Sequence, residues 1–163
     1  MANLCIMIGP AGCGKSTVAK EVAKDASFCT IVSSDEIRKE LYKDETVQKD
    51  HAKVFKLAHE RVIENLKAGK DVIFDATNLL RVHRKELIEC VAPFANRVVG
   101  VVYDGDLETC LKRNASRDRH VPEDVISRMY STLHGKHNKP IVEEGFDILY
   151  SMKAFREDWN KYL

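Results

Sequence analysis

Nine residues near the N-terminus constrain the fold more than any other part of the chain. Their sequence, GPAGCGKST at positions 9–17, matches the pattern G-x-x-x-x-G-K-[ST], the Walker A phosphate-binding loop. The loop follows an apolar run at 4–8 and precedes a helical pattern at 15–25, which is the strand–loop–helix context that this motif requires. The alternative interpretation is a glycine-rich turn that only joins a strand to a helix.

Each residue type in this loop suits the binding of a polyphosphate. Glycine lets backbone N–H groups turn inward, and the helix that begins near Lys15 directs its positive end at the same anion. Lys15 can reach the β- and γ-phosphates, and the Ser16 hydroxyl can coordinate Mg²⁺. We therefore expect a nucleoside triphosphate, ATP, and Mg²⁺ as cofactors. The expected nucleotide-binding residues of the loop are Gly9, Gly12, Cys13, Gly14, Lys15, Ser16 and Thr17.

Short β-type runs alternate with longer helical patterns along the chain. The runs are rich in large apolar residues, as buried parallel strands are, and lie at 4–8, 29–33, 72–74, 98–103 and 146–150. The helical patterns lie at 15–25, 46–67, 82–91 and 122–134. This alternation predicts an α/β fold of the P-loop NTPase, kinase-type class: a three-layer sandwich with a five-stranded parallel sheet and a helical lid. Ligands of such sheets bind beyond the carboxyl ends of the strands.

Length and composition fit one globular domain over residues 1–163. The 26 Lys and Arg residues against 25 Asp and Glu residues leave a net charge of +1, so the whole chain has no long-range attraction to nucleic acid or to an anionic membrane. The five cysteines are widely spaced, which indicates the reduced thiols of a cytoplasmic protein and not a disulfide framework or a zinc site. No run approaches the ~20 apolar residues of a membrane helix, and we expect no signal peptide and no membrane partner.

A carboxylate and an arginine follow the second predicted strand. Asp35 lies at the carboxyl edge of the sheet beside the phosphate loop, where a kinase needs a general base for the acceptor hydroxyl. Arg38 is three residues further on, on the same helix face, and is placed to hold an anionic group of the acceptor. The alternatives are a helix N-cap for Asp35 and an exposed helix position for Arg38.

The third predicted strand ends at a second carboxylate, Asp75. An acidic residue there resembles a Walker B aspartate, which could support Mg²⁺ through water or hydrogen-bond Ser16. Ser16 and Asp75 are therefore the candidate metal residues, and Asn78 is a candidate for substrate binding. Asp and Asn are also turn residues, so a turn is the alternative for both Asp75 and Asn78.

The most basic stretch of the chain is KRNASRDRH at 112–120, which carries four Lys or Arg residues against one Asp, a local charge of 4 − 1 = +3. Arg113 and Arg117 are four residues apart, so we expect both on one face of the preceding helix. Phosphoryl transfer develops charge on oxygen atoms, and a mobile lid that delivers arginines would stabilise this charge. A solvated basic face is the alternative.

Together these segments resemble the 5′-kinase domain of bacteriophage-type polynucleotide kinases, within the AAA_33 or zeta-toxin-like group of P-loop kinases. The likeness covers about residues 3–133. It is carried by the loop at 9–17, Asp35-x-x-Arg38, Asp75-x-Thr77-Asn78, Lys112-Arg113-Asn114 with Arg117, and VPEDV at 121–125 leading to Met129-Tyr130. We expect a kinase domain without the phosphatase domain that follows it in the phage enzyme.

The resemblance implies a role for each matching residue. On the acceptor side, Asp35 would be the general base for a 5′-hydroxyl and Arg38 would grip a phosphate of the acceptor strand. On the donor side, the residues implied are Lys15 and Ser16 at the phosphates and Mg²⁺, Asp75 in support of them, Arg117 on the transferring group and Arg113 beside the donor nucleotide.

Three hypotheses for the function remain open. The first is an ATP- and Mg²⁺-dependent kinase of the 5′-hydroxyl of a nucleic acid or nucleotide. The second is a kinase of a small metabolite such as a nucleoside, a sugar or an amino sugar, which the near-neutral charge favours because polyanion binding relies on basic surface. The third is a nucleotide-binding switch that regulates a partner and transfers nothing.

Overall fold

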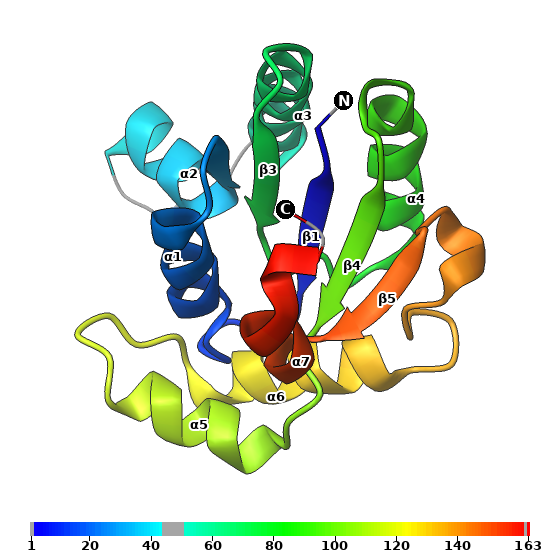
Figure 1. Ribbon diagram of the computed structural model, residues 1–163. Helices are drawn as coiled ribbons and strands as arrows, with labels where there is room; N and C mark the ends of the chain where they lie inside the picture. The colour runs from blue at the N-terminus through cyan, green and yellow to red at the C-terminus, as the bar shows by residue number, and fades with distance from the viewer. Residues whose placement is uncertain (1, 44–50, 162) are drawn as a thin grey trace.

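Five parallel strands form the centre of the molecule. The computed structural model describes residues 2–43, 51–161 and 163, and its sheet has the order β2-β3-β1-β4-β5 (Figure 1). The strands are β1 (Leu4–Ile8), β2 (Cys29–Ser33), β3 (Asp71–Asp75), β4 (Val98–Val102) and β5 (Ile148–Ser151). Every residue of the central strand β1 is buried, whereas the edge strands β2 and β5 are mostly half-buried. This confirms the predicted five-stranded parallel sheet.

Helices cover both faces of the sheet, and this makes the three layers that the sequence predicts (Figure 1). On one face, α3 (His51–Lys67) and α4 (Arg81–Val91) pack on Leu4, Ile6 and Ile8 of β1. On the other face, α1 (Lys15–Asp25) and α7 (Met152–Asp158) pack on Cys5 and Met7. Side chains of β1 alternate between the two cores because successive residues of a strand point to opposite faces.

Three further helices lie toward the carboxyl ends of the strands. They are α2 (Ser34–Tyr42), α5 (Leu107–Ala115) and α6 (Glu123–His134), and Figure 1 shows α5 and α6 together below the sheet. Short 3₁₀ turns at Ala92–Phe94, Val142–Glu144 and Trp159–Lys161 complete the described elements. The pair α5–α6 has the place expected of the helical lid.

A buried ion pair holds the region after β3 to the segment that precedes β5. Arg84 of α4 and Glu144 are both fully buried side chains, and the Arg84 Nε and Nη2 atoms donate to the two Glu144 carboxylate oxygens at 2.6 and 2.9 Å. Arg84 also donates to the carbonyl oxygens of Asn78, Leu79 and Asn138. A buried guanidinium with this many partners fixes the backbone path of three loops at once.

Several predicted boundaries differ from those of the structure. The last strand begins at Ile148 and not at 146, because Phe146 turns inward against Gly100. The long helix is described from His51, and the rest of its predicted range, 46–50, lies outside the described residues. Helix α5 ends at Ala115, so the prediction that Arg113 and Arg117 share one helix face is wrong.

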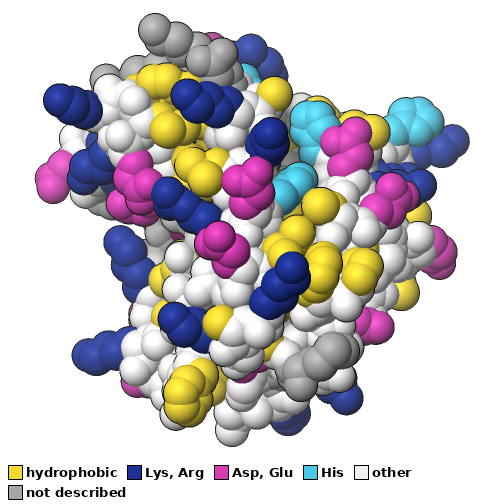
Figure 2. Space-filling view, turned by 90° about the horizontal axis from the view of Figure 1, so that it is seen from above, with side chains coloured by type: hydrophobic (Ala, Val, Ile, Leu, Met, Phe, Trp, Pro, Cys, Tyr) yellow, Lys and Arg dark blue, Asp and Glu magenta, His cyan; other side chains and the backbone are white. Residues whose placement is uncertain are grey.

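The surface carries charges of both signs. Figure 2 shows lysine and arginine side chains interspersed with aspartate and glutamate, and no continuous basic track crosses this face. Within the part of the chain that the structure describes, no helix is both long and apolar enough to span a membrane.

Candidate active site

The phosphate loop lies between β1 and α1, at the carboxyl edge of the sheet. Gly12 and Gly14 have positive φ angles of 80° and 100°, a backbone conformation that glycine adopts without steric cost. A Cβ atom on Gly9 would lie 2.8 Å from Tyr103 Cβ and 2.9 Å from Cys13 Sγ, so this position also has room for glycine alone. The three glycines of the motif therefore have separate steric reasons to be there.

Lys15 is buried at the first turn of α1, and its side chain folds back over the loop. Its Nζ atom donates to the carbonyl oxygen of Pro10 at 2.8 Å and lies 3.8 Å from Cys13 Sγ. The Cys13 side chain is buried beneath the loop beside Cys110. A hydrogen bond from the Cys110 thiol lowers the pKa of Cys13 to about 6, and the nearby Lys15 ammonium acts in the same direction. Because its sulfur lies below the loop, Cys13 could contact a phosphate only through its backbone.

Two oxygen-bearing side chains meet where the loop faces β3. The Ser16 hydroxyl donates to Asp75 Oδ2 at 2.6 Å, across 59 residues of sequence. Asp75 is buried at the end of β3, whereas Ser16 and its neighbour Thr17 are exposed toward the cavity. Hydroxyl and carboxylate oxygens are ligands that Mg²⁺ prefers, and Mg²⁺ usually takes only one or two of them from protein. The two residues thus fit the expected metal, and the described residues hold no cluster of three or more His, Cys, Asp or Glu side chains that could bind a metal by themselves.

Asp35 lies in the first turn of α2 and not at its cap. The N-cap is Ser33, whose hydroxyl oxygen accepts from the Glu36 backbone N–H at 3.3 Å, so the alternative interpretation of Asp35 as a helix N-cap is wrong. The Asp35 side chain is 47% exposed and lines the cavity. A carboxylate with no capping task and with solvent access is free to contact a ligand.

Arg38 is buried against Asp35 and is not the exposed helix residue of the alternative interpretation. Its Nη1 atom lies 3.2 Å from Asp35 Oδ1 and 3.5 Å from Ser34 Oγ, and its Nη2 atom lies 3.5 Å from His51 Nδ1. The Arg38 Nε atom is buried without a hydrogen-bond partner among the described residues. Arg119 approaches the other carboxylate oxygen of Asp35, at 3.9 Å. Asp35 is therefore the centre of a small charged cluster.

Asn78 has a structural contact that the sequence does not reveal. Its side-chain amide nitrogen donates to the Met7 carbonyl oxygen of β1 at 2.7 Å, and its backbone has a positive φ of 49°. Arg84 does not line the cavity, but its Nη1 atom donates to the Asn78 carbonyl oxygen at 2.9 Å. Asn78 also lines the cavity, so its assignment to substrate binding stays a prediction.

The last turn of α5 and the segment that follows it bring two arginines to the phosphate loop. Arg113 Nη1 donates to the Cys13 carbonyl oxygen at 2.5 Å. Arg117 lies beyond the end of the helix, with its Nη1 atom 3.6 Å from the position of a Cβ on Gly12. The buried Asn114 side chain closes this segment, because it donates to the Val121 carbonyl at 2.6 Å and accepts from the Val121 N–H at 2.9 Å. Arg113 thus reaches the loop from the last turn of α5, and Arg117 reaches it from the closed turn that follows.

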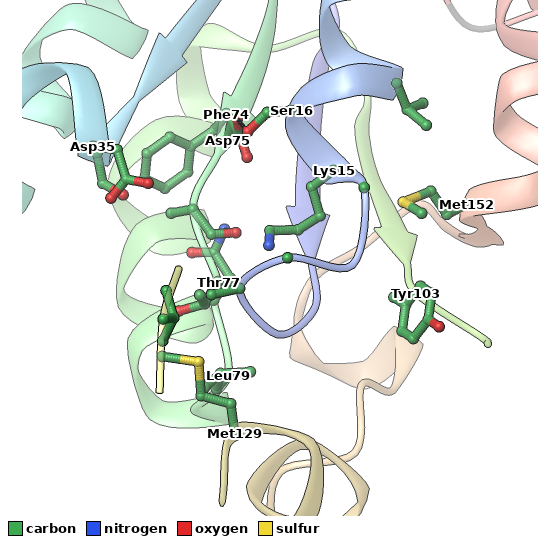
Figure 3. A pocket seen from close by; sticks show the side chains of 18 of the residues that line it. Lys15, Ser16, Asp35, Phe74, Asp75, Thr77, Leu79, Tyr103, Met129 and Met152 are labelled. Atoms are coloured by element: carbon green, nitrogen blue, oxygen red, sulfur yellow. Dashed lines mark hydrogen bonds between the residues drawn. The ribbon is translucent and has the colours of Figure 1, made fainter. Parts of the chain in front are cut away.

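One cavity of about 1550 Å³ is lined by Lys15, Asp35 and Arg117 together. Figure 3 shows Lys15 near its centre, with Asp35, Phe74, Leu79 and Met129 on one side and Tyr103 and Met152 on the other. The side of Tyr103 and Met152 also contains Arg113. The loop therefore separates two parts of one cavity, as a reaction between two substrates requires.

Every predicted site residue except Gly9 and Cys13 lines this cavity, and those two lie in the loop that forms its floor. Sequence reasoning assigned no role to Arg119, which approaches Asp35, and named Asn114, which closes the turn that carries Arg117, only as part of the Lys112-Arg113-Asn114 pattern. The charge of the basic stretch at 112–120 is the local signal for Arg119.

Fold and loop together define a P-loop domain of the kinase type. A family model described as an AAA domain (AAA_33) matches residues 4–135, which is most of the chain, and the protein belongs to this family.

Solved structures with the same fold come from proteins whose names indicate different functions. The structure of the Pnkp1/Rnl/Hen1 RNA repair complex matches with 24% identity and a TM-score of 0.72, over 81% of this chain and 44% of that one. A sugar kinase from Janibacter sp. HTCC2649 matches with 19% identity and a TM-score of 0.67, over 99% and 91% of the two chains. A gluconokinase from Sinorhizobium meliloti 1021 matches with 18% identity and a TM-score of 0.62, over 91% and 81%. The chain spans less than half the length of the RNA repair protein, and these likenesses establish the fold alone.

Proposed function

We propose that the protein is a kinase that transfers the γ-phosphoryl group of ATP to a hydroxyl acceptor, the 5′-hydroxyl of a polynucleotide or nucleotide. The observation that carries the proposal is the position of Asp35. This half-exposed carboxylate lines the same cavity as Lys15 and lies across it in Figure 3. A carboxylate opposite a phosphate loop can orient an alcohol and accept its proton.

The proposed reaction is an in-line transfer. The acceptor oxygen forms a bond to the γ-phosphorus, the bond from that phosphorus to the β,γ-bridging oxygen breaks, and ADP leaves. Asp35 accepts the acceptor's proton and releases it to solvent. Lys15 and Arg117 stabilise the charge on the transferring group, and Arg113 holds the donor beside the loop. Mg²⁺, held by Ser16 and Asp75, would neutralise phosphate charge when bound.

A small-molecule acceptor is the second candidate. Two observations favour it: the net charge of +1 and the mixed charges of the face in Figure 2, since proteins that grip polyanions rely on clustered basic side chains. The sugar kinase and the gluconokinase share the fold. If the acceptor is a small molecule, Asp35 and the phosphate loop keep their roles and only the acceptor changes.

The test is transfer of labelled γ-phosphate from ATP to a 5′-hydroxyl oligonucleotide, a nucleoside and a hexose, each at low and high salt. We expect labelled oligonucleotide product, and a fall in its yield with salt, because polyanion binding weakens with salt. Label in the nucleoside or hexose alone would support the second candidate.

Asp35→Asn should lower transfer about a hundredfold or more, because it removes the proton acceptor and keeps the shape of the side chain. Glu36→Gln is the matched control, since Glu36 is an exposed neighbour on α2 that does not line the main cavity. Tight ATP binding with no labelled product from any acceptor would overturn the kinase proposal and leave the nucleotide-dependent switch.

A further inference from the structure

The cavity continues beyond Asp35 into a part that the proposed chemistry does not use. Its walls are apolar and come from four elements and the loop after β3. The wall residues are Phe55 of α3, Phe74 of β3, Leu79, Leu87 of α4 and Met129 of α6. We call the part of the cavity that these five residues line the acceptor chamber. Figure 3 shows Phe74, Leu79 and Met129 on the same side of Lys15 as Asp35.

Two aromatic rings belong to the wall of this chamber, of which Phe55 is half-buried and Phe74 is fully buried. Phe55 and Phe74 meet edge to face, with ring centroids 6.5 Å apart and an interplanar angle of 88°. Apolar and aromatic walls favour a ligand group that is itself planar or apolar. A hydroxyl-rich body would leave its O–H groups without partners against Leu79, Leu87 and Met129, which costs free energy for each unpaired group.

Polar side chains line the cavity beside the chamber, and we name those of α3 and α4 the rim. On α3 and α4 they are His51, His59, His83 and Glu86, and none of the described cavity residues of these two helices is a lysine or arginine. Burial lowers the pKa of His59, although the negative charge of Glu86 acts in the opposite direction. Burial therefore disfavours a positive charge on His59, so this imidazole balances little of the Glu86 charge.

The charge of this rim determines which acceptors can enter. A phosphate or carboxylate on the far side of the acceptor would face Glu86 with no cation of α3 or α4 to balance it, and like charges repel. A group with N–H or O–H donors would instead find an acceptor in the Glu86 carboxylate, and a charge-assisted hydrogen bond is stronger than a neutral one. The described side chains form no hydrogen bond or ion pair that occupies Glu86.

We infer that the acceptor chamber binds an uncharged planar ring carried by the acceptor alcohol, and that Glu86 accepts a hydrogen bond from the far edge of that ring. The inference rests on the proposed function, because Asp35 must hold the alcohol for the ring to lie in the chamber. Acceptors of this kind have a primary hydroxyl in a molecule that also carries a nitrogen-containing ring. It could come from the terminal nucleoside of a nucleic acid or from a free nucleoside.

The first test compares acceptors with and without the ring. Binding to the full chain is measured by calorimetry for a 5′-hydroxyl dinucleotide, for the same molecule with an abasic first residue, and for free adenosine. We expect loss of the ring to weaken binding at least tenfold, because contact between a base and aromatic side chains stabilises the complex. Equal binding of the dinucleotide and its abasic form would overturn the inference.

The second test changes Glu86, an exposed residue whose substitution leaves the core intact. Glu86→Gln should raise the KM for ring-bearing acceptors about tenfold and change kcat far less, since a hydrogen bond to a charged group is replaced by a neutral one. Glu89→Gln is the matched control, because Glu89 is exposed on the same helix and does not line the cavity. Identical acceptor KM values for the two variants would also overturn the inference.

The two tests separate this inference from the kinase proposal. Ring-dependent binding without phosphoryl transfer would support the chamber and defeat the proposed reaction. Transfer to abasic and ring-bearing acceptors at equal kcat/KM would support the reaction and defeat the chamber. Ring-dependent binding that is tighter for the dinucleotide than for adenosine would assign the ring to a nucleic acid end, and the reverse order would assign it to a free nucleoside.

Discussion

Ser16 and Asp75 are joined by a hydrogen bond of 2.6 Å, which ties the first turn of α1 to the end of β3. The bond holds two oxygen atoms side by side at the edge of the cavity, where a phosphate chain bound to the loop would end. A side chain held by a partner binds a metal more tightly than a free one, because less conformational freedom is lost on binding. The pair would therefore form a preformed half-site for the proposed Mg²⁺.

Removal of either oxygen should raise the Mg²⁺ requirement. We expect Ser16→Ala and Asp75→Asn each to raise the Mg²⁺ concentration for half-maximal phosphoryl transfer about tenfold or more, in line with the loss of a ligand or of its supporting partner. The measurement is a Mg²⁺ titration at saturating ATP. Ser131→Ala, an exposed serine of α6, serves as the control. Unchanged Mg²⁺ dependence in both variants would contradict the placement of the metal.

Arg38 should matter more for the acceptor than for ATP. Its Nη1 atom lies 3.2 Å from Asp35 Oδ1, on the carboxylate that we propose as the base for the acceptor. We expect Arg38→Ala to raise the acceptor KM at least tenfold while the KM for ATP changes about twofold or less. Steady-state kinetics with each substrate varied in turn provide the measurement. An equal rise in both KM values would mean that Arg38 contacts the donor.

The Arg84–Glu144 pair should dominate the stability of the loops around the site. Arg84→Met removes the main partner of the buried Glu144 carboxylate, which among the described residues keeps only the Ile141 N–H at 2.8 Å and Arg81 Nε at 3.6 Å. Breaking a buried ion pair in this way costs about 3–5 kcal/mol. The free energy of unfolding is measured by urea titration, with Trp159 fluorescence as the signal. Arg61→Met is the control, because the Arg61–Glu40 pair is partly exposed and should contribute at most about 1 kcal/mol. If Arg84→Met and Arg61→Met lowered the free energy of unfolding by similar amounts, the buried pair would contribute no more than the exposed one.

How much the sequence predicts depends on how local each determinant is. The phosphate loop is a contiguous pattern, and the strand–loop–helix unit around it appears with the predicted bounds, at 4–8 and 15–25. Edge strand β5 is less well predicted, because its start depends on Phe146 turning toward Gly100 of another strand. The sheet and its layers follow from patterns of apolar residues, whereas strand ends follow from tertiary contacts.

The site residues also divide into those that a local sequence pattern predicts and those that depend on tertiary contacts. Asp35 and Asp75 were identified because each follows a strand, and the parallel sheet brings strand ends to one edge. Arg84 and Glu144 are 60 residues apart in the sequence and neither belongs to a motif, so no local pattern marks their pairing. The end of α5 was also unpredictable, because the Asn114 side chain, through its contacts with Val121, closes the turn that removes Arg117 from the helix.

Gly14 should be required for nucleotide binding and not only for the fold. Its φ of 100° is strained for any other residue, and a Cβ there would lie 2.6 Å from Arg113 Nη1, the atom that donates to the Cys13 carbonyl. Gly14→Ala should therefore displace the Arg113 guanidinium from the loop. We expect a loss of about 1–2 kcal/mol in stability from the left-handed backbone, together with at least a tenfold loss of ATP affinity.

Gly69 offers the control that separates these two effects. Its φ is +78°, but a Cβ there would have no neighbour within 4 Å. Gly69→Ala should thus lower the free energy of unfolding by a similar amount, about 1–2 kcal/mol, because the backbone cost is the same. It should leave ATP affinity, measured with a fluorescent nucleotide analogue, at the value of the unmodified protein, since Gly69 lies after α3, far along the chain from the loop. If both variants bound the analogue equally well, Arg113 could not be the residue that couples Gly14 to the donor.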